Sequence, residues 1–221
     1  GTSAERRFLP FLLRRGVLGP RQIIPALSRA MLTPCMGLNA AFRRNKLWYA
    51  GLSETVVSRH ACDFVDEVLV DFLAEPVLEV ITGLREEGHA LILLTGAPSF
   101  LAREVARRLA FDDVVSTELE VRDGRFTGRL AGPHYFRDEK VHGVNDLVQR
   151  HELDLAECVG LADHPADIPF LSCFGRPIAV HPRPALRRHA SRRGWEVIDG
   201  RSEPPATPAS LRSEPTSPVR R

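Results

Sequence analysis

Two aspartates four residues apart are the side chains whose spacing points most directly to chemistry. Asp163 and Asp167 follow a short apolar run at residues 158–161, which we predict to be a buried strand. A helix is predicted over 165–174, so Asp163 precedes it and Asp167 lies in its first turn. Asp163 would then lie at the carboxyl end of a strand, with Asp167 one helical turn beyond it. Ligands bind at this edge of open α/β sheets. Such carboxylates suit Mg²⁺, although an N-cap aspartate followed by an unrelated acid would give the same spacing.

A threonine and a glycine form a second candidate site. Thr95 and Gly96 directly follow an apolar strand predicted over 90–94 and precede Pro98, where we predict a helix over 98–109. A hydroxyl and free backbone N–H groups at a helix start would hold phosphate oxygens. The same two residues would serve equally well as a simple helix cap.

Lys140 is the third candidate, because it falls in the first turn of a helix predicted over 138–151. A cation at this end of a helix opposes the helix dipole and gains nothing locally. Asp138 and Glu139 would offset it, so an ordinary surface lysine remains the alternative.

The elements that must position these residues change in character along the chain. The first 75 residues are predicted to be all-helical, with helices over 5–15, 21–31, 38–49 and 53–73, the last beginning at a Ser53 cap. Later segments alternate between strand and helix, which predicts an α/β fold with a parallel sheet between helices.

The later elements expected from the pattern are a hairpin within 114–130 that turns at Asp123-Gly124, the helix and strand described above, a strand over 177–180, a helix over 184–193 and a strand over 195–198. The tail at 200–221, rich in Pro, Ser and Arg, is predicted to be disordered.

The composition is that of a globular chain of 221 residues, with 43% hydrophobic and 26% charged residues. Its four cysteines form no CxxC pair, which argues against a disulfide framework or a zinc site and favours a reducing, cytoplasmic compartment. No apolar run approaches the ~20 residues that a membrane-spanning helix needs, and no signal-peptide pattern opens the chain. The chain begins with Gly rather than Met, so we expect residues to be missing ahead of it.

The first fifty residues are strongly basic. They hold nine Lys and Arg against one acid, Glu5, a net charge of +8. Such a field would attract an anionic substrate, an acidic membrane surface or nucleic acid, although basic helix faces are mostly just solvated. We expect no nucleic-acid partner.

Taken in order, these features resemble three of the four motifs of the haloacid dehalogenase superfamily, in its phosphoserine-phosphatase-like branch. The resemblance rests on the strand that ends at Thr95-Gly96, the hairpin 121–128, Lys140, and the segment 163–171 running into 177–182. The last motif usually reads GDSxxDxPxL. Here Ala162 and His164 replace its Gly and Ser, and the Asp-x-Pro-x-Leu ending is kept.

The resemblance implies a three-layer, Rossmann-like core at 76–199 with an all-helical cap at 1–75. It implies phosphoryl transfer from a small phosphorylated substrate through an aspartyl-phosphate, assisted by Mg²⁺. Thr95 and Gly96 would bind the phosphoryl group and Lys140 would neutralise it. Asp163 would bind the metal, and Asp167 would orient Lys140 or a metal-bound water.

Substrate specificity in such a protein would come from side chains of the cap. Arg6, Arg7, Asn45 and Lys46 are the candidates. His164, next to the metal position, is either a substrate or solvent contact or a plain helix-start histidine.

The family's first motif, DxDxT, which carries the nucleophile and the general acid, has no counterpart in the sequence, because no Asp-x-Asp occurs in it. We interpret this as truncation ahead of Gly1, with natural loss of the motif as the alternative. The missing motif would end the central first strand of the sheet, so the strands at 90–94 and 158–161 are expected either to flank a slot about 9 to 10 Å wide, two strand spacings, or to close over it.

Three functions follow as hypotheses. The first is a Mg²⁺-dependent phosphomonoester hydrolase, inactive without its nucleophile. The second is a non-catalytic phosphate- or anion-binding relative whose basic cap contacts a partner, a membrane surface or nucleic acid. The third is a module of a longer lipid-pathway enzyme, because this branch also occurs fused to acyltransferases.

Overall fold

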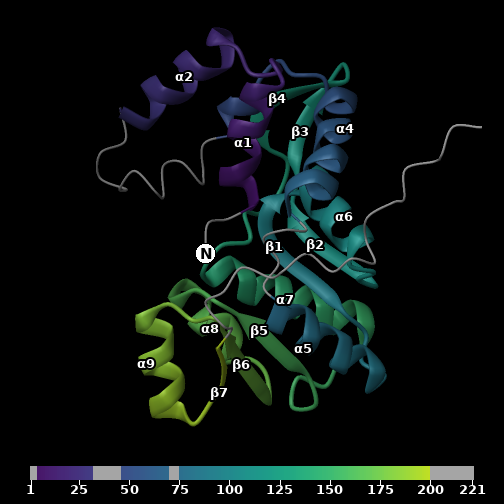
Figure 1. Cartoon of the computed structure of the whole chain (residues 1–221), viewed down its shortest axis with the longest axis vertical. Coiled ribbons are helices and arrows are strands. Elements are labelled where there is room, and N and C mark those ends of the chain that lie inside the picture. The colour runs from purple at the N-terminus through teal and green to yellow at the C-terminus, as the bar shows by residue number, and fades with distance from the viewer. Residues whose placement is uncertain (1–3, 32–45, 70–74, 200–221) are drawn as a thin grey trace, which may run out of the picture.

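The structure is a computed structural model that describes residues 4–31, 46–69 and 75–199. Two groups of elements lie one above the other in Figure 1, with a pair of parallel strands between them. The predicted tail at 200–221 lies outside the described residues.

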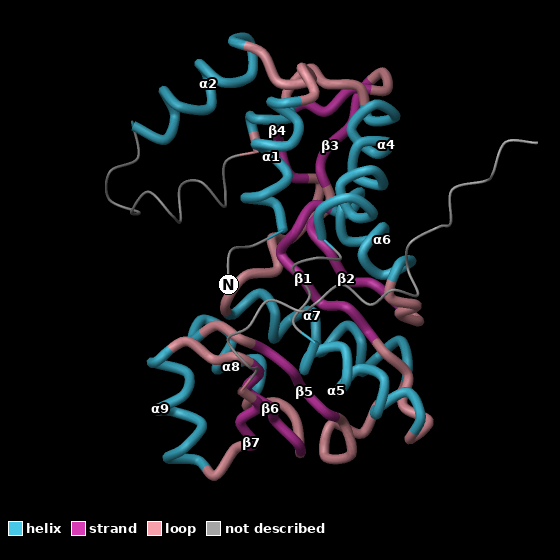
Figure 2. Tube along the Cα trace, in the orientation of Figure 1, coloured by secondary structure: helices cyan, strands magenta, loops and turns pink. Residues whose placement is uncertain are grey.

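The helical elements include 3₁₀ turns (η2, η5) and one π turn (η3). In chain order they are α1 (Ala4–Arg14), α2 (Pro20–Met31), η2 (Leu47–Tyr49), α4 (Glu54–Phe64), η3 (Val65–Leu69), α5 (Glu75–Glu86), α6 (Ser99–Arg108), α7 (Asp138–His151), η5 (Pro165–Asp167), α8 (Ile168–Leu171) and α9 (Pro184–Arg193). The strands are β1 (Ile92–Pro98), β2 (Asp113–Thr117), β3 (Leu119–Arg122), β4 (Arg125–Leu130), β5 (Val159–Ala162), β6 (Arg176–Val180) and β7 (Glu196–Ile198). Figure 2 separates the two classes by colour.

The upper group in Figure 1 is held together by an aromatic core. α1 turns its apolar residues to one face, where Phe8 and Phe11 meet Phe64 of α4 with ring centroids 5.3 and 5.5 Å apart. We call this cluster the N-terminal core. Its buried members are Phe8, Leu9, Phe11, Leu12, Leu18, Tyr49, Leu52, Val57, Ala61, Phe64, Val65, Phe100, Leu101, Leu119 and Phe126.

The β3–β4 hairpin packs on this core, because Leu119 and Phe126 belong to it. The amide of Gly51 also donates to the carbonyl of Phe126 over 2.8 Å. The hairpin turns at Asp123-Gly124, both with positive φ, as the sequence predicts. Elements from both halves of the sequence therefore build the upper group.

The lower group is a parallel sheet covered by helices. β5, β6 and β7 pair in that order, all parallel, and α8 and α9 pack against them. The cluster beneath, which we call the C-terminal core, has as its buried members Val144, Phe170, Leu171, Ala179, Leu186 and Ala190. Partly buried Leu94 of β1 and Ala162 of β5 pack against the same cluster.

The parallel strands form two separate sheets rather than one. β1 pairs in parallel with β2, while β5 belongs to the separate β5–β6–β7 sheet, so no ladder joins β1 to β5 in the described chain. Direct closure of these two strands is therefore the wrong alternative. The α/β architecture with parallel strands and helices is confirmed, and none of the described helices is both long and apolar enough to cross a bilayer.

Three local predictions need correction. Residues 47–49 form a 3₁₀ turn rather than the end of a long helix, and residues 38–45 lie outside the described chain. Ser53 does precede α4, but its side chain makes no capping hydrogen bond, and α4 ends at Phe64 in the π turn η3. Residues 113–117 form β2, parallel to β1, and are not part of the hairpin.

Candidate functional site

The structure joins two of the predicted site residues directly. The ammonium of Lys140 lies 2.9 Å from Oδ1 of Asp167, and the two side chains are only 14% and 11% exposed. The same ammonium lies 5.1 Å from the centroid of the Phe170 ring, within cation–π range. Lys140 is therefore not an ordinary surface lysine, and Asp167 is more than an acid that happens to follow Asp163.

The backbone explains why this pair forms. α7 begins at Asp138, so Lys140 stands in its first turn, and η5 carries Asp167 at its last residue. α7 and α8 pack against each other, which brings the start of one helix to the turn before the other. The N-terminal end of the helix dipole is positive and does not stabilise the Lys140 ammonium. The negative carboxylate of Asp167 stabilises it instead.

Asp163 lies where the sequence predicts, directly after β5. Its side chain is exposed, and its backbone carbonyl accepts from the amide of Arg183 over 3.0 Å. His164 serves as the N-cap of η5, where its Nδ1 accepts from the amide of Ala166 over 3.0 Å. The helix-start interpretation of His164 is thus confirmed.

Thr95 and Gly96 lie within β1, at a break in its pairing with β2. The register shifts between Leu94 and Pro98, and Thr95 Oγ1 accepts from the amide of Ala97 over 3.2 Å. The N-cap of α6 is Pro98, so Thr95 is not a helix cap. Because a threonine hydroxyl also has a proton to donate, Thr95 keeps a donor for a ligand.

Gly96 is a point of close approach between β1 and the segment before α7. A Cβ atom built there would lie 2.8 Å from the carbonyl oxygen of Tyr135. No side chain therefore fits at this position without displacing the backbone at Tyr135.

The four predicted residues border one packed cluster. Leu94, which precedes Thr95, and Ala162, which precedes Asp163, both pack against the C-terminal core. Val144, one turn after Lys140, is a buried member of it, and Ile168, which follows Asp167, packs against it. Thr95, Lys140, and the Asp163 and Asp167 pair are thus brought to the border of one core from three separate segments.

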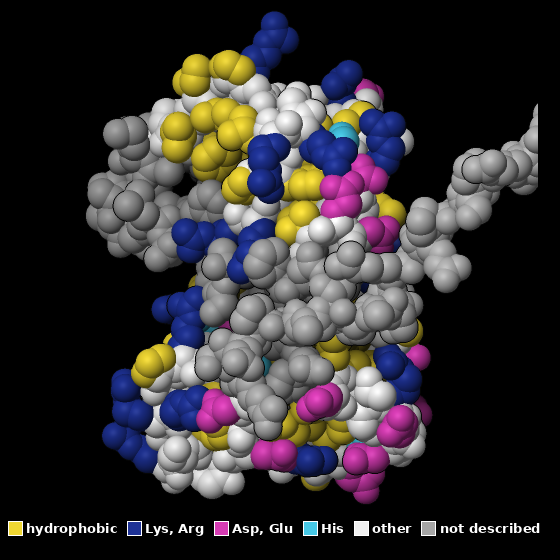
Figure 3. All heavy atoms as spheres, in the orientation of Figure 1, with side chains coloured by type: hydrophobic (Ala, Val, Ile, Leu, Met, Phe, Trp, Pro, Cys, Tyr) yellow, Lys and Arg dark blue, Asp and Glu magenta, His cyan; other side chains and the backbone are white. Residues whose placement is uncertain are grey.

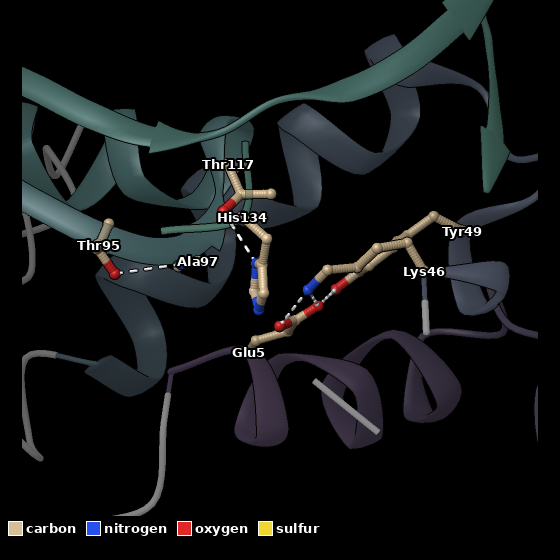
Figure 4. Close-up of polar contacts among 7 residues, drawn as sticks. All are labelled: Glu5, Lys46, Tyr49, Thr95, Ala97, Thr117 and His134. Carbon is tan, nitrogen blue, oxygen red and sulfur yellow. Dashed lines mark hydrogen bonds and ion pairs between the residues drawn. The ribbon is translucent and has the colours of Figure 1, made fainter. Parts of the chain in front are cut away.

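A second polar cluster, which the sequence did not reveal as a unit, lies between α1 and the end of β2 (Figure 4). Lys46 is fully buried, and its ammonium donates to both carboxylate oxygens of Glu5 over 2.6 and 2.7 Å. The Tyr49 hydroxyl donates to Glu5 over 3.4 Å. Thr117 Oγ1 lies 3.2 Å from Nδ1 of His134, whose ring extends toward the Glu5–Lys46 pair in Figure 4.

This cluster bears on the residues predicted to set specificity. Lys46 has no exposed surface and its ammonium donates to both oxygens of Glu5, so it contacts a substrate only if that pair opens. Arg6 is exposed, Arg7 is half-buried, and Asn45 lies outside the described residues. The sequence signal that could have identified Thr117 is the run Val114-Val115-Ser116-Thr117, an apolar strand pattern that ends in a hydroxyl.

The described residues contain no group of three His, Cys, Asp or Glu side chains arranged to hold a metal ion. They do supply the exposed carboxylate of Asp163. Proteins commonly hold Mg²⁺ through only one or two carboxylates, together with waters and substrate phosphate. Asp163 thus fits as one ligand of such an ion.

Comparison with known proteins decides the family. A sequence profile of haloacid dehalogenase-like hydrolases matches residues 2–172. The chain belongs to this family. It is 35% identical over 139 residues to the phosphoserine phosphatase SerB1 of Mycobacterium tuberculosis, an alignment that covers 63% of the chain and 45% of that protein. The chain thus spans less than half the length of this curated relative.

Solved structures agree on the fold. A Bordetella pertussis protein of unknown function superposes with a TM-score of 0.62 at 30% identity, covering 88% of this chain and 82% of the other. A probable phosphoserine phosphatase from Vibrio cholerae gives a TM-score of 0.64 at 17% identity, covering 90% and 58%. The fold thus agrees with the family match, and the sequence similarity to SerB1 indicates the phosphoserine-phosphatase-like branch. Phosphatases of the haloacid dehalogenase family typically use Mg²⁺.

Proposed function

We propose that the protein hydrolyses a small phosphomonoester and that Lys140, Asp167, Thr95 and Asp163 surround the transferring phosphoryl group. The single observation that carries this proposal is the Lys140–Asp167 pair, 2.9 Å apart and largely withdrawn from solvent. A lysine held this way at the border of the C-terminal core offers a fixed positive charge to an anion. We expect the reaction to take place in the cytoplasm.

Each residue has a distinct part in this proposal. The Thr95 hydroxyl, which already accepts from Ala97, donates its proton to a phosphoryl oxygen. The backbone of Gly96 lies against the same group, and Lys140 neutralises its charge. Asp167 holds Lys140 in place, so it is a positioning residue.

Asp163 is proposed to hold Mg²⁺. Bound there, the ion would neutralise charge that develops on the phosphoryl oxygens and on the leaving oxygen. The exposed position of Asp163 after β5 leaves room for the waters and the substrate phosphate that would complete its shell.

The nucleophile is proposed to come from a segment outside these 221 residues. The divided sheet supports this proposal, because β1 and β5 share no ladder and a central strand between them would place its end beside Thr95 and Asp163. The chain as given would then bind phosphate without turning it over. We also propose the division into a cap at 1–75 and a core at 76–199, with the hairpin of the core packed on the cap.

The leaving group is proposed to face the second polar cluster. Glu5, Lys46 and Tyr49 come from the proposed cap, while Thr117 and His134 come from the proposed core. A substrate held between Thr95 and this cluster would meet both at once (Figure 4).

The alternative is a non-catalytic phosphate binder. The absence of Asp-x-Asp from the sequence favours it, because the family's nucleophile lies in that motif. Such a protein would use Thr95, Lys140 and Asp163 to hold an anion and would release no phosphate.

The test uses the protein expressed from its complete gene, so that any Asp-x-Asp segment encoded ahead of Gly1 is included. Phosphate release from a broad panel of phosphomonoesters is measured with Mg²⁺ and with EDTA. We expect Mg²⁺-dependent release, and a fall in kcat/KM of about 100-fold or more for Lys140→Ala. Gln149→Ala, an exposed position on the same helix, should leave the rate unchanged.

Binding of inorganic phosphate, measured by calorimetry, separates the two functions. Phosphate binding that Lys140→Ala abolishes, without release from any substrate, identifies the non-catalytic binder. Hydrolysis that Lys140→Ala leaves intact would overturn the proposed site.

A further inference from the structure

The large hydrophobic side chains exposed in the described chain all lie on α1 and α2. They are Leu13, Ile24 and Leu27, which are 52%, 65% and 50% exposed. α1 and α2 are joined by a short turn at residues 15–19. In Figure 3 hydrophobic side chains gather at the upper left, where Figure 1 places α2, with Lys and Arg side chains at their border.

α2 is held by one face only. Ala26 is fully buried, and the side-chain amide of Gln22 donates to the carbonyl of Ala50 over 3.3 Å. Ile24 and Leu27, three residues apart, share another face of the helix, which is exposed. The helix therefore projects from the body (Figure 1), with Ala26 packed and Ile24 and Leu27 exposed.

The charge around this face has one sign. Residues 6–53 contain nine Lys and Arg and no Asp or Glu. Arg14 and Arg21 are exposed beside the face, and neither has an acidic partner among the described residues. Arg15, by contrast, pairs with Glu67 over 2.6 Å.

We propose that the apolar face of α2, together with Leu13, docks on an anionic lipid bilayer surface. An amphipathic helix with apolar residues on one face and arginines at its border lies in the membrane interface, with the apolar side chains among the acyl chains and the cations at the lipid phosphates. The inference concerns the outer surface of the protein and does not depend on the proposed reaction.

Other occupants fit the observations less well. A second copy of the chain that docks on this face would bring Arg14 and Arg21 of each copy together, and like charges repel. Nucleic acid would use the arginines but not the exposed isoleucine and leucines, because phosphate contacts need no apolar side chains.

The experiment sediments the full chain with vesicles of pure phosphatidylcholine and with vesicles of equal parts phosphatidylcholine and phosphatidylglycerol. Binding is expected only to the anionic vesicles and should weaken as salt is added. Ile24→Ser with Leu27→Ser should weaken it at least about 10-fold, because the inserted apolar area is lost. Ile24→Leu with Leu27→Ile should preserve it.

The arginines are tested separately. Arg14→Gln with Arg21→Gln should weaken binding by about 25-fold, from about 5-fold per cation at an anionic surface. Arg192→Gln with Arg193→Gln, which removes two exposed arginines from α9, should have little effect and serves as the matched control.

Four outcomes would overturn the inference. One is equal binding to both kinds of vesicle or to neither. The second is binding that the two serine substitutions leave unchanged. The third is a dimer in sedimentation velocity that these substitutions dissociate, since a second copy would then cover the face. The fourth is a melting temperature that the serine substitutions lower by several degrees, since the face would then be covered by the chain itself.

Discussion

At the scale of single residues, the arrangement most sensitive to substitution is the buried ion pair of Glu5 and Lys46. The Lys46 side chain has no exposure, and its ammonium reaches both oxygens of one carboxylate. Removal of one partner leaves the other as an unpaired buried charge, which is strongly destabilising. The pair links α1 to the segment before η2, 41 residues away in sequence.

Replacement of Lys46 by Met should therefore destabilise the protein by about 3–5 kcal/mol, because Glu5 is left as an unpaired buried charge. The free energy of unfolding in urea measures the loss. The double variant Glu5→Leu with Lys46→Met removes both charges and should recover most of it. A double variant no more stable than Lys46→Met alone would contradict this account of the pair.

Tyr49 makes stability depend on alkaline pH. Complete burial raises the pKa of its hydroxyl well above the usual value, and the negative charge of Glu5 and the hydrogen bond to it raise it further. The folded protein therefore holds this proton more tightly than the unfolded chain. The stabilisation is fully present below about pH 10 and is lost as the pH rises above it.

Urea unfolding at a series of pH values from about 8 to about 11 measures this dependence. Tyr49→Phe removes the hydroxyl while Lys46 still satisfies Glu5, so the variant should lose less stability over that range. An unchanged slope would show that other groups, such as Tyr135 with its raised pKa, account for the effect.

At the scale of elements, the contact of α7 with β1 positions Lys140 relative to Thr95. A Cβ at Gly143 would lie 2.9 Å from Cδ1 of Leu94, so the helix approaches the strand through a residue without a side chain. Gly143 is buried, three residues after Lys140 on the same helix. A larger residue there must displace the Leu94 and Tyr135 side chains or shift the helix away from the strand.

Gly143→Val should destabilise the protein by about 1–3 kcal/mol and should weaken phosphate binding, because Lys140 moves with α7. Gly83→Val is the matched control in α5, where a Cβ would meet nothing within 4 Å. It should be neutral or slightly stabilising. Thermal unfolding and calorimetry provide the two measurements, and equal effects at both sites would contradict the close-approach argument.

Local signals decide which elements could be predicted. α7 at 138–151 and α9 at 184–193 agree with the predicted bounds, since acidic residues begin the first, and Pro184 and Gly194 delimit the second. β2 was missed because its partner is β1, some twenty residues earlier, and nothing in residues 113–117 distinguishes a parallel strand from a hairpin arm.

The same distinction applies to the site. Asp163 and Lys140 could be found from their places after a strand and at a helix start. The contact of Lys140 with Asp167 depends on how α7 packs on α8, so only the family resemblance suggested it. The polar cluster of Glu5, Lys46 and His134 could not be predicted, because its members come from three distant segments.

At the scale of the whole molecule, the two cores share no residue. β1, β2 and α6 connect them, with Leu94 packed against the C-terminal core and Phe100 within the N-terminal core. Regions that bury separate apolar clusters can open separately. The two groups of elements are therefore expected to differ in their response to a core substitution.

Leu12→Ala and Leu186→Ala make a matched pair, because each removes the same fully buried side chain from a different core. Each should cost about 2–5 kcal/mol. Hydrogen exchange should rise most in α1 and α4 for the first variant, and in α9 and β6 for the second. A uniform rise across the chain in both variants would show that the molecule opens only as one unit.

The divided sheet also affects how copies of the chain associate with one another. β1 and β5 each have a single strand partner among the described residues, so each leaves one row of backbone N–H and C=O groups without a strand beside it. Such borders are templates for intermolecular pairing, which leads to domain swapping and aggregation. Concentrated solutions of this chain should therefore turn turbid on standing, and a peptide able to add a strand at these borders should keep them clear.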